Sequence, residues 1–188
     1  MTDAAAPRKS RIRKPVVVGV IVGVVLTVVM VLASGFMIDT TNTDVFCAKC
    51  HIMKPFRMAW QNAVHGGHNP QGFAAQCVDC HLPHGNFFEY FIVKGMTGTG
   101  DVIQNFYVDG ATFDWAGNAE KNRTKFTFES ACRHCHHVLT PPGIRRGGLM
   151  AHRTFLRGET SKTCADCHPR VGHKNMIEIA DQFFKEKT

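Results

Sequence analysis

The residues with the clearest chemical potential are eight cysteines, which occur in four segments of the form C-x-x-C-H. These segments are Cys47 to His51, Cys77 to His81, Cys132 to His136 and Cys164 to His168. The eight cysteines are Cys47, Cys50, Cys77, Cys80, Cys132, Cys135, Cys164 and Cys167, so none is left outside a motif. Two thiols at this spacing can form thioethers to two vinyl groups of a porphyrin, and the adjacent histidine can then bind its iron. The pattern predicts four covalently attached c-type haems.

Paired cysteines have two other common uses besides haem attachment. Cys₄ zinc sites also use C-x-x-C pairs, and exported proteins use cysteines for disulfides. Neither use requires a histidine directly after every pair, yet a histidine stands there all four times. Haem attachment is therefore the interpretation that accounts for the whole pattern.

Seven further histidines could supply second axial ligands to the irons. His134 and His137 lie in or directly after a motif, which is poor geometry for a distal ligand. His68 and His84 are plausible ligands, but both could simply be solvated. The better candidates lie farther from the motifs and are His65, His152 and His173. Met53 follows His51 by two residues, and a methionine thioether can also bind haem iron, although ordinary core packing is the alternative.

One apolar segment positions the motifs relative to a membrane. Residues 15–38 contain no charged residue. This segment is long enough to cross a bilayer as a helix, and it is longer than the ~7–15 residues of a signal-peptide core. Five basic residues precede it and give the tail, residues 1–14, most of the net charge of +7. By the positive-inside rule this end stays in the cytoplasm and residues 39–188 are exported. A cleaved signal peptide is the alternative.

The elements expected in residues 39–188 are mostly short helices and loops. Motif starts are separated by 30, 55 and 32 residues, which suggests two dihaem halves. Helical apolar spacing predicts a helix over 176–185, and residues 87–93 form a short apolar segment suited to a partly buried or interfacial helix. Residues 94–101 are rich in glycine, which argues against one long helix through them, and residues 141–148 should form a loop. The fold class expected is mostly α with much irregular structure, comprising a transmembrane helix and a compact multihaem domain. Outside the tail the sequence has no basic stripe with interleaved aromatics, so it gives no indication of nucleic-acid binding.

The chain resembles the NapC/NrfH/NirT family of membrane-anchored tetrahaem quinol dehydrogenases. The resemblance rests on the N-terminal apolar segment, the four motifs, the first motif's C-H-x-M, and the segments CHIMKP (50–55) and CVDCHLPHGN (77–86). The last segment is similar to the NrfH branch, which serves a pentahaem nitrite reductase. His84 stands where that branch would have threonine, and the spacing between His65 and Cys77 is longer than in that branch.

The resemblance implies a ligand set. The first haem would be held by Met53 rather than His51, with Asp101 approaching its other face. His136 would pair with His173, and His168 with His65. His81 would hold the second haem, together with His152 or with a lysine from a partner.

The resemblance also implies a function. Lys94 and Asp101 would form the quinol site, with menaquinol or ubiquinol as substrate. Electrons would pass to a periplasmic reductase, for which nitrite reductase is the first expectation and nitrate reductase the second. The expected location is the inner membrane, as a single-pass protein in contact with lipid and the quinol pool. Two alternatives are an electron-transferring anchor that does not oxidise quinol and a terminal reductase with an open iron.

Overall fold

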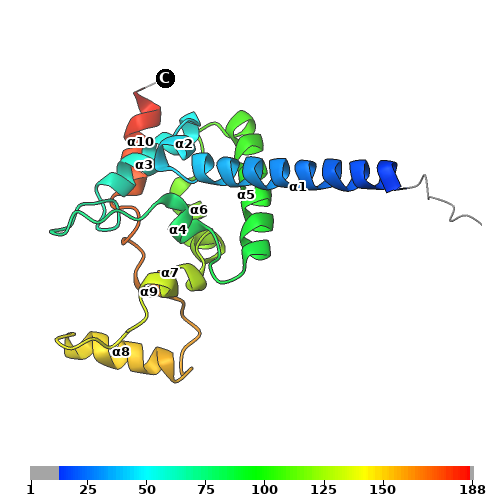
Figure 1. The fold of residues 1–188 in the computed structure, drawn as a ribbon. Coiled ribbons are helices and arrows are strands. Elements are labelled where there is room, and N and C mark those ends of the chain that lie inside the picture. The colour runs from blue at the N-terminus through cyan, green and yellow to red at the C-terminus, as the bar shows by residue number, and fades with distance from the viewer. Residues whose placement is uncertain (1–12, 187–188) are drawn as a thin grey trace, which may run out of the picture. The chain divides into compact units, whose positions relative to one another are not determined.

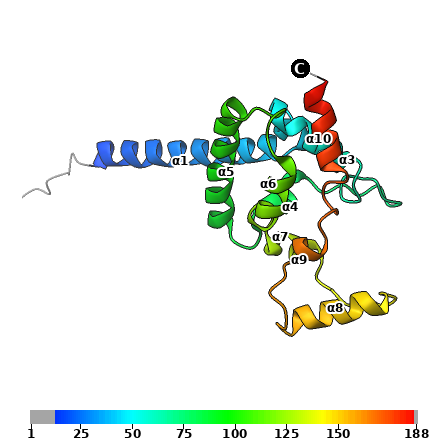
Figure 2. The same ribbon diagram turned by 180° about the vertical axis from the view of Figure 1, so that it is seen from behind.

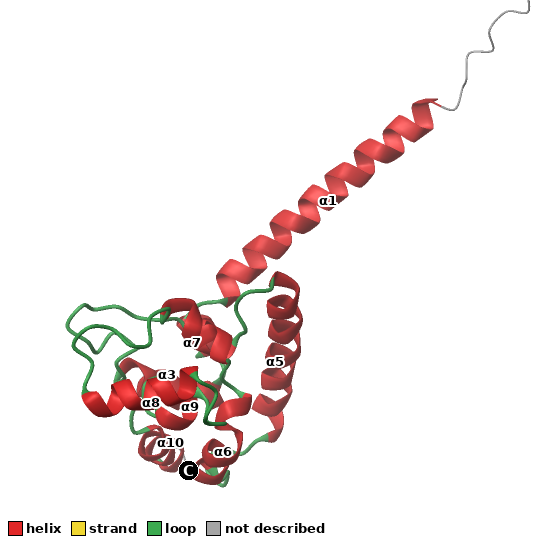
Figure 3. Cartoon of the chain, turned by 90° about the horizontal axis from the view of Figure 1, so that it is seen from below, coloured by secondary structure: helices red, strands yellow, loops and turns green. Residues whose placement is uncertain are grey.

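The structure is a computed structural model, and it describes residues 13–186. Its regular elements are all helical, and within the described residues the only strand-like pairing is an isolated bridge between Gly66 and Ala74. Figure 3 shows the helices joined by long loops. The mostly helical, irregular fold class expected from the sequence is confirmed.

The chain divides into two units, residues 1–41 and residues 42–188. The first contains helix α1, Arg13–Thr41, which includes the whole apolar segment 15–38. This helix is long and apolar enough to cross a membrane, with a mean hydropathy of 3.1 in its most apolar window. Most of the basic tail, residues 1–12, lies outside the described residues.

The second unit contains the remaining helices, labelled in Figures 1 and 2. The α-helices are α2 Asp44–Cys47, α3 Lys54–Gln61, α4 Cys77–His81, α5 Phe87–Tyr107, α6 Trp115–Asn122, α7 Glu129–Cys135, α8 Arg146–Leu156, α9 Cys164–Cys167 and α10 Met176–Lys185. Two short 3₁₀ helices are η1 His51–Met53 and η2 Arg123–Lys125. The helix expected over 176–185 is confirmed. The division into two dihaem halves is not confirmed, since residues 42–188 form one unit.

A small core holds α3, α6 and α10 together. Trp115 of α6 stacks on Phe184 of α10 with ring centroids 5.7 Å apart, and the edge of Phe56 of α3 meets the same indole at 5.3 Å. Ala59 and Ala180 are fully buried where α3 packs on α10. Few side chains are buried for a unit of this length, which fits a domain whose apolar interior is completed by porphyrins.

Two loop expectations are wrong. Helix α5 runs without interruption through the glycine-rich residues 94–101. Asn86 caps it, because its side-chain oxygen accepts from the backbone N–H groups of Phe88 and Glu89. Each glycine costs about 1 kcal/mol relative to alanine, but the cooperative hydrogen bonding of a long helix outweighs that cost. Residues 142–143 do form a turn, but α8 begins at Arg146, inside the expected loop.

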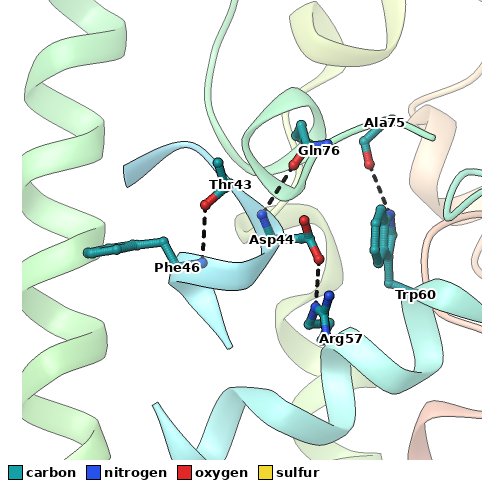
Figure 4. A network of polar contacts seen from close by, with 7 residues as sticks. All are labelled: Thr43, Asp44, Phe46, Arg57, Trp60, Ala75 and Gln76. Carbon is teal, nitrogen blue, oxygen red and sulfur yellow. Dashed lines mark hydrogen bonds and ion pairs between the residues drawn. The ribbon is translucent and has the colours of Figure 1, made fainter. Parts of the chain in front are cut away.

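A polar network joins the first motif to the approach of the second (Figure 4). Asp44, at the start of α2, accepts a hydrogen bond at its carboxylate Oδ2 from Arg57 Nε at 2.6 Å, and its backbone N–H donates to Gln76 Oε1 at 3.1 Å. The indole N–H of Trp60 donates to the Ala75 carbonyl at 3.0 Å. Helices α2 and α3 are thereby tied to residues 75–76, which lead directly into α4.

Candidate functional site

Each cysteine pair lies at a helical turn. Helix α4 contains the whole second motif, α7 and α9 end at the second cysteine of the third and fourth motifs, and α2 ends at Cys47 of the first. Residues three apart on a helix share a face, so both thiols of such a pair can reach one ligand. None of the eight cysteines forms a disulfide, so each pair stays available for attachment.

The motifs follow one another in space in the same order as in the chain. Cys47 lies close enough to Cys77 for each side chain to affect the pKa of the other, which brings the first motif beside the second. Cys80 in turn lies near Cys132, and Cys132 lies near Cys164. Helices α4 and α7 pack together, as do α7 and α9. The four attachment sites therefore form a continuous row.

Three motif histidines each face a histidine from outside the motifs. The rings of His81 and His173, of His136 and His65, and of His168 and His152 all lie with centroids 6.0 Å apart. Two metal–nitrogen bonds of about 2 Å, together with the distance from each nitrogen to its ring centre, add to about 6 Å. Each pair is therefore spaced to hold one metal ion between two imidazoles.

Backbone carbonyls orient these imidazoles. The Nδ1 atoms of His65, His81 and His173 donate to the carbonyls of Val171, Phe126 and Phe56 at 3.1, 2.6 and 3.1 Å. His152 makes the same kind of bond to the Leu139 carbonyl. A donor at Nδ1 leaves Nε2 as the unprotonated nitrogen that binds a metal. Burial also lowers the pKa of His81, and it lowers that of His173 to about 4 with a smaller contribution from His81.

The donor set fits c-type haem. Imidazoles held in opposed pairs beside a C-x-x-C turn would supply the nitrogen ligands that the iron of a covalently attached haem takes. Three of the four attachment sites have such a pair, and the three partners are the distal candidates named from the sequence, His65, His152 and His173. Ligation itself stays a proposal.

The structure brings the histidines together in other combinations than the resemblance implies. His173 faces His81, His65 faces His136, and His152 faces His168. A histidine of the same chain thus lies beside His81, and the ligand set of each haem stays a proposal. Which imidazole meets which depends on long-range contacts such as that of His65 with the Val171 carbonyl, and local spacing does not carry this information.

The first motif is built differently from the others. His51 is exposed and faces no other histidine in the described part of the chain. Met53 is half-buried and packs against the core cluster of Ile52 and Trp115. This contrast supports Met53 as the ligand, although ordinary core packing of Met53 would give the same contacts.

Lys94 and Asp101 lie two turns apart on α5, so they share a face. Burial raises the pKa of Asp101, with the nearby His81 opposing the effect, although the residue keeps contact with solvent. Burial lowers the pKa of Lys94, with Cys47 opposing the effect, and its Nζ donates to Asn42 Oδ1 at 2.6 Å. Both charges lie close enough to Cys47 to affect its pKa. The structure thus brings the expected quinol-site pair beside the first motif.

Sequence reasoning missed one cluster near the second and third motifs. His84 and His134 stack with centroids 4.5 Å apart and an interplanar angle of 18°, and this distance is too short to hold an iron between them. A small open cavity of about 260 Å³ lies beside His84 and Tyr90. His84 stands where the NrfH branch has threonine, which is the signal that could have drawn attention to it.

The fold and the paired donors define a c-type cytochrome. A model of the NapC/NirT cytochrome c family, N-terminal region, matches residues 9–178. The chain belongs to this family of electron-transport cytochromes.

Individual relatives agree with this assignment. The chain is 31% identical over 146 residues to the tetraheme c-type cytochrome CymA of Shewanella oneidensis, covering 71% of this chain and 76% of that one. It is 28% identical to the cytochrome c-type protein NapC of Haemophilus influenzae, covering 80% and 78%. A crystal structure of the cytochrome c nitrite reductase NrfHA complex bound to the HQNO inhibitor matches with a TM-score of 0.56 and 28% identity, covering 84% of this chain and 91% of the matched chain.

Proposed function

We propose that this chain is a single-pass inner-membrane cytochrome with four covalent haems, which oxidises membrane quinol and delivers electrons to a periplasmic reductase. The residues on the N-terminal side of α1 stay in the cytoplasm, and the haem domain is periplasmic. When bound, the haems supply one-electron carriers along the row of attachment motifs. The observation that carries the proposal is that Lys94 and Asp101 lie beside the first motif.

This end of the row is tethered close to the membrane. Asn42 directly follows α1, and its side-chain oxygen accepts from both Lys94 Nζ and the Tyr90 hydroxyl, at 2.6 and 2.9 Å. Helix α5 is therefore held within a few residues of the membrane segment. Its exposed apolar side chains, Phe88, Ile92, Met96, Val102 and Phe106, suit contact with lipid and with a lipid-soluble substrate.

The two ionisable groups have separate roles in quinol oxidation. Quinol releases two protons with its two electrons, so the site needs a base. Asp101 is the base, because its raised pKa favours proton uptake relative to an ordinary carboxylate. Lys94 orients a quinol oxygen through its ammonium group while Asn42 holds that group in place. The substrate is menaquinol or ubiquinol.

For the partner we favour a nitrite reductase over a nitrate reductase. Support comes from the CHLPxGN form of residues 80–86 and from the structural match to a chain of a nitrite reductase complex. The similarity to NapC points to the second choice. Copurification from solubilised membranes, followed by identification of the attached reductase, separates the two.

The test of quinol oxidation uses full-length protein in detergent, without oxygen. A reduced menaquinone analogue should reduce the haems of the wild type, and Asp101→Asn should slow this at least ~10-fold. Glu89→Gln, on the same helix, is the matched control and should leave the rate unchanged. Dithionite should reduce all variants fully. Equal rates for wild type and Asp101→Asn would remove Asp101 from the role, and no reduction of the wild type by quinol would favour the non-oxidising anchor.

A further inference from the structure

One segment near the fourth motif differs in charge from the rest of the chain. Residues 137–158 contain four arginines and no acidic residue, while the whole chain has 22 basic and 15 acidic residues. The arginines are Arg145, Arg146, Arg153 and Arg157, and they lie on α8 or directly beside it. Because no carboxylate is interspersed, their positive charges add in one place.

These charges are available at the surface. Arg145, Arg146 and Arg153 are exposed, and none of them forms an ion pair within residues 13–186. Arg157 is different, because its guanidinium binds Glu159 through two contacts of 2.6 and 2.8 Å. Three unneutralised guanidinium groups therefore remain, and guanidinium is the group best suited to pairing with carboxylates on another surface.

Helix α8 presents two different faces. Leu149, His152 and Phe155 are half-buried, and His152 faces His168 of the fourth motif. Met150 is 50% exposed and lies one turn from both Arg146 and Arg153, so it shares their face. An exposed apolar centre with a charged rim is the composition of a protein–protein contact surface.

The place of α8 in the fold supplies the reason for such a surface. Figures 1 and 2 show α8 with a long connection on each side and with α7 and α9 between it and α4. The row of motifs begins beside Asn42 and the quinol site and ends at the fourth motif, where His168 faces His152 of α8. On the proposed function, electrons enter at the first end and must leave at the other.

We propose that the arginine face of α8, defined by Arg145, Arg146 and Arg153, docks the acidic surface of a soluble redox partner at the fourth motif. This inference rests on the proposed direction of electron flow. Complementary charge would raise the encounter rate and orient the partner over the exit site. An anionic lipid surface is the other ligand that arginines suit, but α8 lies at the opposite end of the row from the residue tethered to the membrane segment.

The experiment measures binding rather than turnover. Full-length oxidised holoprotein in nanodiscs is titrated with two soluble probes, the acidic protein plastocyanin and the basic protein cytochrome c, at low and at high salt. The test variant is R145E/R146E/R153E. The matched control is K121E/K125E/K174E, which changes the net charge equally at exposed residues of other elements. Haem spectra show whether charge reversal disturbs folding. If it does, the neutral variant R145Q/R146Q/R153Q replaces the charge-reversed one in the test.

The wild type should bind plastocyanin more tightly at low salt than at high salt. R145E/R146E/R153E should weaken that binding at least ~10-fold and strengthen binding of cytochrome c, while the control should change either by less than ~2-fold. Equal effects of the two triple variants would show that only net charge matters and would overturn the proposal. So would unchanged plastocyanin binding together with arginine-dependent binding to phosphatidylglycerol vesicles. Neither result depends on quinol, so a failure here is distinct from a failure of the proposed function.

Discussion

At the scale of single residues, the structure shows how a neutral imidazole is prepared for a metal. His173 is partly buried, desolvation lowers its pKa to about 4, and its Nδ1 donates to the Phe56 carbonyl. The free nitrogen is then Nε2, on the side of the ring that can face His81. The hydrogen bond to Phe56 orients this side chain without help from a metal, and this preorganisation reduces the entropy cost of ligation.

Replacing His173 with alanine should convert one low-spin haem to a high-spin form, because the iron loses one of two imidazoles. Electron paramagnetic resonance of the oxidised protein measures the change. His68→Ala is the matched control and should leave the spectrum unaltered. The new high-spin signal should vanish when Cys77→Ser and Cys80→Ser are added, since His173 faces the second motif. If it vanished instead with Cys132→Ser and Cys135→Ser, the pairing with His81 would be wrong.

The pH dependence of quinol oxidation tests Asp101 as a base. Only the deprotonated carboxylate accepts a proton, so the rate should rise with pH as Asp101 ionises. Because burial raises its pKa, that rise should lie above the ordinary value of 3.8. Rapid-mixing measurements of haem reduction across the pH range provide the profile. Asp101→Asn should lose this limb and Glu89→Gln should keep it; a limb retained in Asp101→Asn would assign the titration to another group.

What the sequence reveals at this scale depends on distance along the chain. Each C-x-x-C-H motif is local, so its chemistry can be read from five adjacent residues. The distal histidines could be named from their number and position, but their partners could not. His65 meets His136 because Val171, more than one hundred residues away, holds its ring, and nothing in the spacing encodes that contact.

At the scale of elements, α5 shows where helix propensity misleads. Gly95, Gly98 and Gly100 predicted a break, yet α5 continues to Tyr107. A methyl group added at any of the three would meet nothing within 4 Å, so the chain's own packing does not require glycine there. The Asn86 cap and the cooperativity of a 21-residue helix outweigh the local cost, and single-residue propensities include neither effect.

Phe184 of α10 lies in the core cluster that joins α3, α6 and α10. Phe184→Ala removes the ring that stacks on Trp115 and should lower the free energy of unfolding by about 3–4 kcal/mol. Chemical denaturation followed by circular dichroism measures this. Phe106→Ala is the control, because Phe106 is 80% exposed and its loss should change stability by less than about 0.5 kcal/mol. Similar losses in both variants would place the core elsewhere.

At the scale of the whole molecule, the chain combines one apolar helix with one compact unit, and the sequence predicted both. Residues 15–38 were found by composition, and α1 contains them entirely. The spatial order of the motifs was not predictable, because it arises from the packing of α4 on α7 and of α7 on α9. That order gives the molecule a direction, from the Asn42 end to the α8 end.

The membrane orientation can be tested with reporters. Alkaline phosphatase fused after Thr188 should be active, because the positive-inside rule keeps the basic flank of α1 in the cytoplasm and exports the rest. Green fluorescent protein at the same position should not fluoresce when exported through the general secretory route. Reversing the flank with R8E/K9E/R11E/R13E/K14E should lower the phosphatase activity. An inactive phosphatase together with fluorescent protein would place the haem domain in the cytoplasm.

The central claim is that porphyrins are covalently attached at the four cysteine motifs, and intact mass spectrometry of denatured protein tests it most directly. The account predicts a mass equal to the polypeptide plus four haems, and the loss of one haem for each motif whose two cysteines are changed to serine. A denatured chain with the mass of the bare polypeptide and no porphyrin absorbance would contradict the account.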